Sequence, residues 1–167
     1  MNLMKNALVI LAGGKGKRIG SNIPKQFIKY GKYNFIEYLF VNKSIKNFDF
    51  LVIVCNKSYV KKYLKILDNL SILAKIIIAK PGNTRQKSSF NALKKLKLYK
   101  PDNVLIHDGA RPLVSNTLIN KVLITLKNNK SAIPYVTYDD RKVVNKNDIS
   151  TNIKNIQTPQ GFKYNLI

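Results

Sequence analysis

The stretch ALVILAGGKGKRIGSNIPKQF, which runs from Ala7 to Phe27, carries the pattern that decides the fold. It opens with an uninterrupted apolar run, Ala7–Ala12, which is typical of a β-strand buried on both faces. Glycines and cations follow directly, where such a strand would end. Glycines let backbone N–H groups approach phosphate oxygens, and the cations supply fixed positive charge. The stretch therefore predicts a first strand followed by a phosphate-binding loop.

Apolar runs of the same kind recur along the chain and alternate with stretches of helical periodicity. The further runs are Phe50–Cys55, Ala74–Ala79, Asn103–His107 and Ser131–Val136. The helical stretches are Asn34–Ile45, Ser58–Leu67, Arg85–Leu96 and Thr117–Leu126, the last with Ser115 or Asn116 as its cap. This alternation predicts an α/β fold, a Rossmann-like, doubly wound and mostly parallel sheet with helices on both faces.

The chain has 167 residues, and we expect one domain over residues 1–167. The polar, β-prone segment over about 135–156 predicts an arm that leaves the sheet. Ligands of doubly wound sheets bind at the carboxyl ends of the strands. Three loops with unusual residues follow predicted strands, and we expect them to converge at one edge: Gly13–Arg18, Gly82–Arg85 and Asp108–Arg111.

Two common phosphate-binding patterns do not fit the glycine loop. A P-loop needs Ser or Thr after its Gly-Lys pair, but Arg18 follows Gly16-Lys17. A dinucleotide-binding loop needs a third glycine where this chain has Ile19. The remaining pattern is G-x-G-x-R with Lys25 downstream. Two fixed cations suit a nucleoside triphosphate whose pyrophosphate leaves, because negative charge builds up on the leaving group.

The formal net charge of +22 has two interpretations. It could attract polyanions such as nucleic acid or phosphorylated metabolites. The lysines are spread along the whole chain, however, which favours compositional drift and leaves nucleic-acid binding as a minor alternative.

The single cysteine, Cys55, lies in an apolar run and predicts a buried, inert thiol in a reducing cytoplasm. With one cysteine and one histidine, a Cys/His zinc site is excluded. No run reaches the roughly 18 apolar residues of a membrane span. Met1–Leu11 is better explained as a first strand than as a signal peptide, because no small-residue cleavage site closes it.

Four ordered motifs resemble those of the 2-C-methyl-D-erythritol 4-phosphate cytidylyltransferase family. They are Ala12–Arg18 followed by Pro24-Lys25-Gln26, then Gly82–Ser88, His107–Pro112 and Gln157–Gln160. The resemblance covers nearly the whole chain. It implies transfer of CMP from CTP to methylerythritol phosphate by in-line attack of the substrate phosphate on the α-phosphorus. It also implies Mg²⁺ as cofactor, CTP as co-substrate and a homodimer formed through the arm.

The resemblance assigns a role to each matching residue. Arg18 and Lys25 would be catalytic, Arg111 and Thr137 would bind the acceptor, and Asp108 would face the metal. The nucleotide would contact Ala12, Gly13, Gly14, Gly16, Gly82, Asn83, Arg85, Ser88, Asp108 and Gly109. For Ser88 a place in the first turns of a helix is an equal alternative. His107 is expected to be a packed imidazole bonded to the backbone.

The chain departs from the family pattern in four places. Asn83 replaces a usual aspartate, and Thr137 matches the family threonine only with a shift of register. A family arginine of the arm has no counterpart, and Lys154 or Arg141 would substitute for it. The family continues beyond Gln157–Gln160 to a late active-site lysine, so we expect this chain to lack a C-terminal part.

The alternatives kept open are a cytidylyltransferase for ribitol or ribulose 5-phosphate and a non-catalytic nucleotide- or nucleic-acid-binding remnant.

Overall fold

The computed structural model describes residues 4–14, 23–41, 44–138, 142–144, 147–149 and 153–167. Its centre is a six-stranded sheet in the order β5-β4-β1-β6-β12-β7. The strands are β1 (Asn6–Leu11), β4 (Phe50–Val54), β5 (Lys75–Ala79), β6 (Asn103–Asp108), β7 (Ser131–Ala132) and β12 (Gln160–Lys163). The first four strands run parallel to one another, and β12 lies antiparallel between β6 and β7.

The sheet is buried on both faces because its central strands are mostly apolar on both sides. In β1, Leu8 and Ile10 belong to one hydrophobic cluster, whereas Ala7 and Val9 belong to another. Successive side chains of a strand point to opposite faces, so the two clusters are the two sides of the sheet. The prediction of a doubly wound, mostly parallel sheet is confirmed.

Four helices cover these two faces. The helices are α1 (Phe35–Val41), α2 (Val60–Asn69), α3 (Arg85–Leu96) and α4 (Asn116–Asn128). Apolar residues of α1, α2 and α4 fill the first cluster, and Ala92 and Leu96 of α3 fill the second. Thr84 and Ser115 cap α3 and α4 by accepting hydrogen bonds from backbone N–H groups inside the first turn. The predicted bounds of α3 are confirmed.

Short elements complete the body. They are the 3₁₀ turns η2 (Lys25–Phe27), η3 (Ser44–Asn47), η4 (Lys57–Tyr59) and η5 (Tyr164–Leu166), and the hairpin of β2 (Lys29–Tyr30) and β3 (Tyr33–Asn34). The helix expected over Asn34–Ile45 is shorter than predicted, because α1 ends at Val41 and residues 44–47 form a 3₁₀ turn. At the start of α1, Asn34 and Glu37 form a reciprocal capping box, in which each side chain accepts a hydrogen bond from the backbone N–H of the other residue.

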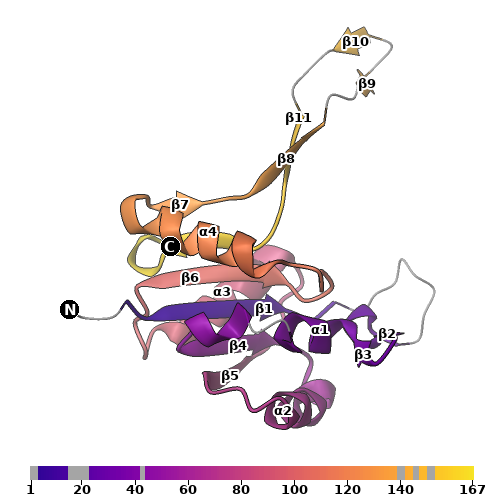
Figure 1. Cartoon of the computed structure of the whole chain (residues 1–167), viewed down its shortest axis with the longest axis vertical. Helices are drawn as coiled ribbons and strands as arrows, with labels where there is room; N and C mark the ends of the chain where they lie inside the picture. The colour runs from indigo at the N-terminus through magenta and orange to yellow at the C-terminus, as the bar shows by residue number, and fades with distance from the viewer. Residues whose placement is uncertain (1–3, 15–22, 42–43, 139–141, 145–146, 150–152) are drawn as a thin grey trace.

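A long arm leaves the sheet after β7, as Figure 1 shows. It is built from β8 (Tyr135–Tyr138) paired with β11 (Ile153–Ile156), and from β9 (Lys142–Val144) paired with β10 (Asn147–Ile149). The expectation of one buried strand over Ser131–Val136 was therefore wrong. The sheet strand stops at Ala132 and the arm starts at Tyr135, with Pro134, which has no N–H for a sheet ladder, between them.

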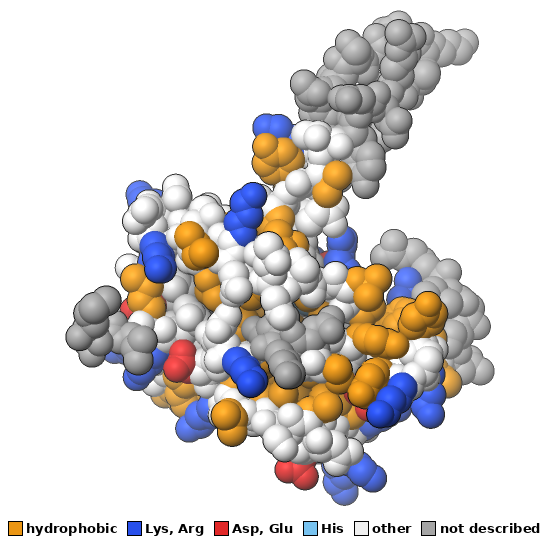
Figure 2. All heavy atoms as spheres, in the orientation of Figure 1, with side chains coloured by type: hydrophobic (Ala, Val, Ile, Leu, Met, Phe, Trp, Pro, Cys, Tyr) orange, Lys and Arg blue, Asp and Glu red, His pale blue; other side chains and the backbone are white. Residues whose placement is uncertain are grey.

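Side-chain distribution agrees with two expectations from composition. Figure 2 shows Lys and Arg side chains scattered over the visible face, with no continuous stripe. Cys55 is buried as a free thiol, and burial raises its pKa to about 11, so it remains protonated near neutral pH. Within the described ranges, none of the helices has the length and apolar character needed to cross a membrane.

Gly161 offers a test of how β12 is seated. A Cβ added there would lie 2.5 Å from Val122 Cγ1 and 2.9 Å from Leu126 Cδ1. We expect Gly161→Ala to lower the free energy of unfolding by about 1–3 kcal/mol, because α4 must move to admit the methyl group. Urea denaturation measures this loss. Ser131→Ala on the neighbouring strand, at an exposed side chain, is the control and should change stability little. Equal stability of the two variants would contradict the packing described.

Candidate functional site

Three loops meet at the carboxyl edge of the sheet. The Gly109 N–H donates to the Leu11 carbonyl (2.9 Å), which joins the ends of β6 and β1. Gly13 approaches the loop after β5 so closely that a Cβ there would lie 2.4 Å from Pro81 Cβ. The predicted convergence of the loops that begin at Gly13, Gly82 and Asp108 is confirmed for their described residues. Only a residue without a side chain allows the contact between Gly13 and Pro81.

Asp108 is the charged centre of this edge. Its two carboxylate oxygens pair with Arg85 Nε at 3.1 Å and with Arg111 Nε at 3.2 Å. All three side chains are partly open to solvent, so these ion pairs contribute little to stability. Their effect is positional, because Asp108 holds two guanidinium groups from different loops side by side. Each arginine pairs through Nε, so N–H groups remain to bind phosphate oxygens.

A chain of contacts ties this centre to the root of the arm. Arg111 Nη1 donates to Gln157 Oε1 at 2.6 Å, and the Gln157 N–H donates to the Pro134 carbonyl at 2.8 Å. Pro134 and Gln157 flank β8 and β11, so they stand where the arm leaves the body. One arginine thus links Asp108 to both strands of the arm.

His107, at 2% exposure, is a packing residue as expected. Its Nε2 lies 3.0 Å from the Arg111 carbonyl oxygen, which can only accept, so Nε2 carries the proton. Nδ1 then accepts from the Thr158 hydroxyl at 3.0 Å. Burial lowers the pKa of His107, and the bond to the Arg111 carbonyl opposes this in part. The neutral imidazole joins the motif around Asp108 to the motif around Gln157.

Ala12, Gly13 and Gly82 are among the residues expected to contact the nucleotide, and the backbone carbonyl of each accepts a hydrogen bond from a side chain. Gln26 Nε2 donates to the Ala12 carbonyl at 2.7 Å, and Asn56 Nδ2 donates to the Gly13 carbonyl at 3.4 Å. Ser88 Oγ accepts from the Gly82 N–H at 3.0 Å and lies 3.5 Å from the Gly82 carbonyl oxygen. Because bonds near 3.5 Å are weak, the carbonyls of Gly13 and Gly82 are the more available acceptors.

Ser88 stands in the first turn of α3, as one of its two interpretations expected, and it also shapes the Gly82 loop. Its contact with the nucleotide stays a prediction. Sequence reasoning missed Gln26 and Asn56 as parts of the site. The signal was available in their positions: Gln26 follows Lys25 in the Pro-Lys-Gln motif, and Asn56 comes directly after a buried strand end.

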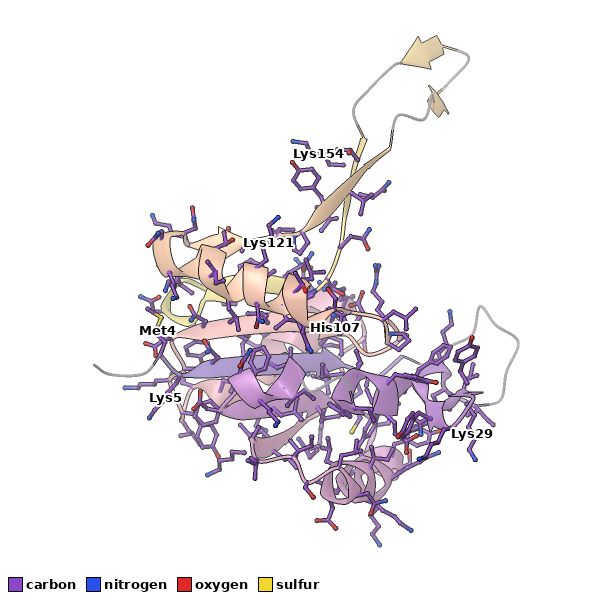
Figure 3. All side chains as sticks on the ribbon, viewed as in Figure 1. Met4, Lys5, Lys29, His107, Lys121 and Lys154 are labelled. Carbon is purple, nitrogen blue, oxygen red and sulfur yellow. The ribbon has the colours of Figure 1, made fainter. Side chains whose placement is uncertain are left out.

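The other predicted site residues differ in exposure. Lys25 is half-buried in η2, whereas Gly14 and Asn83 are exposed in their loops. Arg18 and Gly16 lie outside the described residues. Thr137 stands in β8 opposite Lys154, on the arm rather than at the sheet edge. Figure 3 shows Lys154 on the arm, away from His107. Among the described residues, the loop positions near Gly13, Gly82 and Asp108 lie together, and Thr137 is set apart from them.

The described residues contain no group of three His, Cys, Asp or Glu side chains that could hold a metal by themselves. Asp108 supplies the one carboxylate that the described part of the three loops offers. A carboxylate has about four lone-pair positions, and the two arginines use two of them. Mg²⁺ is commonly bound by one or two carboxylates together with substrate phosphates, so this donor set suits a metal that arrives with a triphosphate.

Comparisons with known proteins agree with this geometry. Residues 6–167 match the sequence profile of the family described as 2-C-methyl-D-erythritol 4-phosphate cytidylyltransferase. The enzyme of that name from Thermosipho africanus is 37% identical, over 95% of this chain and 73% of its own length. The bifunctional enzyme IspD/IspF of Pelagibacter ubique is 39% identical over 96% of this chain and 44% of its own length.

Solved structures show the same similarity. A crystal structure of 4-diphosphocytidyl-2C-methyl-D-erythritol synthase from Anaerococcus prevotii superposes with a TM-score of 0.82 at 26% identity. The match covers 99% of this chain and 74% of that one. The bifunctional IspDF of Campylobacter jejuni gives a TM-score of 0.76 at 26% identity, over 97% of this chain and 42% of its own.

The buried imidazole predicts a pH-dependent stability. Because the pKa of His107 is lowered in the folded state, its neutral form stabilises the fold fully above about pH 6.5, the ordinary histidine value. This contribution falls away as the pH drops below that value toward the folded pKa. His107→Gln keeps a donor but cannot titrate, so the wild-type advantage in urea midpoint should shrink from pH 7.5 to pH 5.5. A constant difference across this range would contradict the assignment.

Proposed function

Because the chain belongs to the 2-C-methyl-D-erythritol 4-phosphate cytidylyltransferase family, we infer that it transfers CMP from CTP to 2-C-methyl-D-erythritol 4-phosphate. The products are 4-diphosphocytidyl-2-C-methyl-D-erythritol and pyrophosphate, and the activity belongs to isoprenoid precursor synthesis. The observation that carries this inference is the family match over residues 6–167, together with three motif loops that meet at one sheet edge.

The reaction is a substitution at phosphorus. An oxygen of the acceptor phosphate forms a bond to the α-phosphorus of CTP as the bond to the β-phosphate oxygen breaks. The attacking phosphate is already ionised near neutral pH, so it needs no general base. The enzyme's contribution is alignment and neutralisation of the charge that grows on pyrophosphate. We assign that neutralisation to Arg18 and Lys25, and the alignment of phosphates to Arg85 and Arg111.

Base selection follows from the carbonyls at the sheet edge. Cytosine differs from uracil by an N4 amino donor, which needs an acceptor. Gly13 and Gly82 supply carbonyl oxygens whose present hydrogen bonds are long, 3.4 and 3.5 Å. The Asn83 side chain, exposed in the same loop, offers a further acceptor and keeps that function where the family usually has aspartate.

Mg²⁺ is part of the same proposal. Bound together with the triphosphate, it would neutralise phosphate charge, and Asp108 is the residue that would hold it. The ion pairs of Asp108 with Arg85 and Arg111 support this place for the metal, because phosphates drawn to the arginines lie beside the carboxylate. A cytoplasmic location completes the proposal and is in keeping with the free thiol of Cys55.

The activity is tested by pyrophosphate release from CTP and Mg²⁺, with methylerythritol phosphate, ribitol phosphate or no acceptor. We expect release with methylerythritol phosphate. Arg18→Ala and Lys25→Ala should each lower kcat by about 10²–10³-fold, because each removes charge stabilisation of the leaving group. Lys121→Ala, on the exposed side of α4, is the control and should keep wild-type turnover. Release only with ribitol phosphate would change the acceptor, and no release with any acceptor would overturn the function.

The arm supports a homodimer as a further part of the proposal. Tyr135 and Ile156 are opposite each other in the β8–β11 ladder and are 53% and 59% exposed. Thr137 and Lys154 form the next pair on the same face of this ladder. The apolar pair Tyr135/Ile156 would pack against a second copy of the chain. The polar pair Thr137/Lys154 would then lie over the sheet edge of that copy, where Thr137 would contact the acceptor.

Light scattering tests the dimer. We expect wild-type protein at twice the chain mass and the double variant Tyr135→Asp/Ile156→Asp shifted toward a single chain, because buried charges without partners oppose association. Leu98→Asp, at a residue 86% exposed on the body, is the matched control and should remain a dimer. A wild-type protein that stays monomeric at tens of micromolar would contradict this proposal without affecting the assignment of CTP.

A further inference from the structure

Gln26 is a buried polar side chain with no assigned role in the proposed reaction. It is 4% exposed, although it stands in a loop segment rich in polar residues. Its Nε2 donates to the Ala12 carbonyl at 2.7 Å, across 14 residues of sequence. This is the shortest tie that the described residues make between the glycine-loop strand end and the turn that carries Lys25.

Both ends of this tie are themselves fixed. On one side the Ala12 N–H donates to the Val54 carbonyl at 2.9 Å, so Ala12 is held to the neighbouring strand. On the other side the turn is closed by hydrogen bonds from the Phe27 N–H to the Pro24 carbonyl and from the Ile28 N–H to the Lys25 carbonyl, at 2.9 and 3.1 Å. Lys25 is the residue directly before Gln26, so it moves with this turn.

The Gln26 side chain has little access to solvent, and aromatic residues pack beside it in the sequence and near it in the core. The Phe27 ring packs against Tyr59 and Tyr63, with ring centroids 5.2 and 5.0 Å apart. Tyr63 is fully buried, and its hydroxyl reaches no hydrogen-bond partner of good geometry in the described part of the chain. Burial raises the pKa of this phenol, and interaction with the Gln26 side chain offsets part of that effect.

An amide enclosed in this way has few alternatives to the Ala12 carbonyl. Removing it would leave a buried carbonyl with one partner fewer, and the loss of a buried hydrogen bond is costly in such a setting. The tie is therefore stiff as well as short.

We propose that Gln26 is a positioning residue that fixes Lys25 relative to the end of β1. The proposal rests on the proposed function, because it takes Lys25 as the cation that meets the phosphates and β1 as the strand whose end faces the base. A nucleotide touches both places at once, so their separation sets where the α-phosphorus lies. A displacement of about 1 Å from the reactive geometry can cost roughly 10²-fold in rate.

The first experiment compares Gln26→Met with wild type. Methionine has a similar length and tolerates burial but cannot donate to the carbonyl. We expect kcat to fall by about 10–100-fold while KM for CTP changes less than about threefold, because alignment is lost rather than uniform binding. Val122→Ala, in the core of α4, is the control for stability. It should lower the urea midpoint to a similar degree and keep kcat within about twofold of wild type.

A double-mutant cycle tests whether Gln26 acts through Lys25. In the Lys25→Ala background, Gln26→Met should lower kcat by less than about threefold, because the group that it positions is already gone. Equal fold-losses in both backgrounds would overturn the proposal, and so would a Gln26→Met variant with wild-type kcat.

Amide hydrogen exchange tests the same proposal and does not depend on catalytic activity. Gln26→Met should speed exchange of the Phe27 and Ile28 amides by about tenfold or more, while Val122→Ala leaves them unchanged. Unchanged exchange in Gln26→Met would overturn the positioning role. If wild-type protein released no pyrophosphate with any acceptor, the proposed function would fail, and the exchange result would still decide whether Gln26 holds the turn.

Discussion

The structure depends on one constraint, the burial of β1 between two parallel neighbours and under two hydrophobic layers. β1 pairs with β4 on one side, from Ala7 to Leu11, and with β6 on the other, from Asn6 to Leu11. Parallel pairing brings the carboxyl ends of these strands to the same edge. Loops that are far apart in the sequence therefore emerge side by side. Their close packing requires glycine at Gly13, where a Cβ would lie 2.4 Å from Pro81 Cβ, and it leaves little room at Gly109, where a Cβ would meet neighbouring atoms at 3.1 Å.

At that edge a strongly basic protein uses an acidic residue to organise its cations. The chain carries 30 Lys and Arg residues against 8 Asp and Glu. Without Asp108, Arg85 and Arg111 would repel each other across the gap between two loops. With it, both guanidinium groups stand at defined positions before any anion arrives. The two arginine side chains are therefore already ordered when a triphosphate binds, so binding loses less side-chain conformational entropy.

Much of the fold could be predicted from the sequence, because its central strands are mostly apolar and its helices keep a clear period. The arm and the meeting of the three loops followed from the same pattern. The chain's return through β12 was not predictable in this way, because Gln160–Lys163 contains one strongly apolar residue and no alternation. The break after Ala132 involves Pro134, which has no N–H to donate to a neighbouring strand. Whether that ends a strand depends on the strand pairing, which the sequence does not show.

In the site, motif spacing located the loops but not the hydrogen bonds that hold them. Gln26 looks like a solvent-facing residue until its burial and its hydrogen bond to the Ala12 carbonyl are known. Likewise Asp108 looks like a free ligand until Arg85, 23 residues away in sequence, is seen to reach it. Contacts of this kind depend on side-chain geometry across loops, which local sequence does not specify.

The return of the chain through β12 has a consequence for how such an enzyme can diversify. The arm begins after β7 and ends before β12, and these two strands are hydrogen-bonded neighbours in the sheet. Both ends of the arm are thus fixed to neighbouring strands of the body, so the arm is an insertion between β7 and β12. Changes of length or sequence within the arm do not alter the strands that carry the three loops. The arm, which carries Thr137, and the sheet edge, which carries the three loops, are therefore distinct structural units of one chain, joined through Arg111 and Gln157.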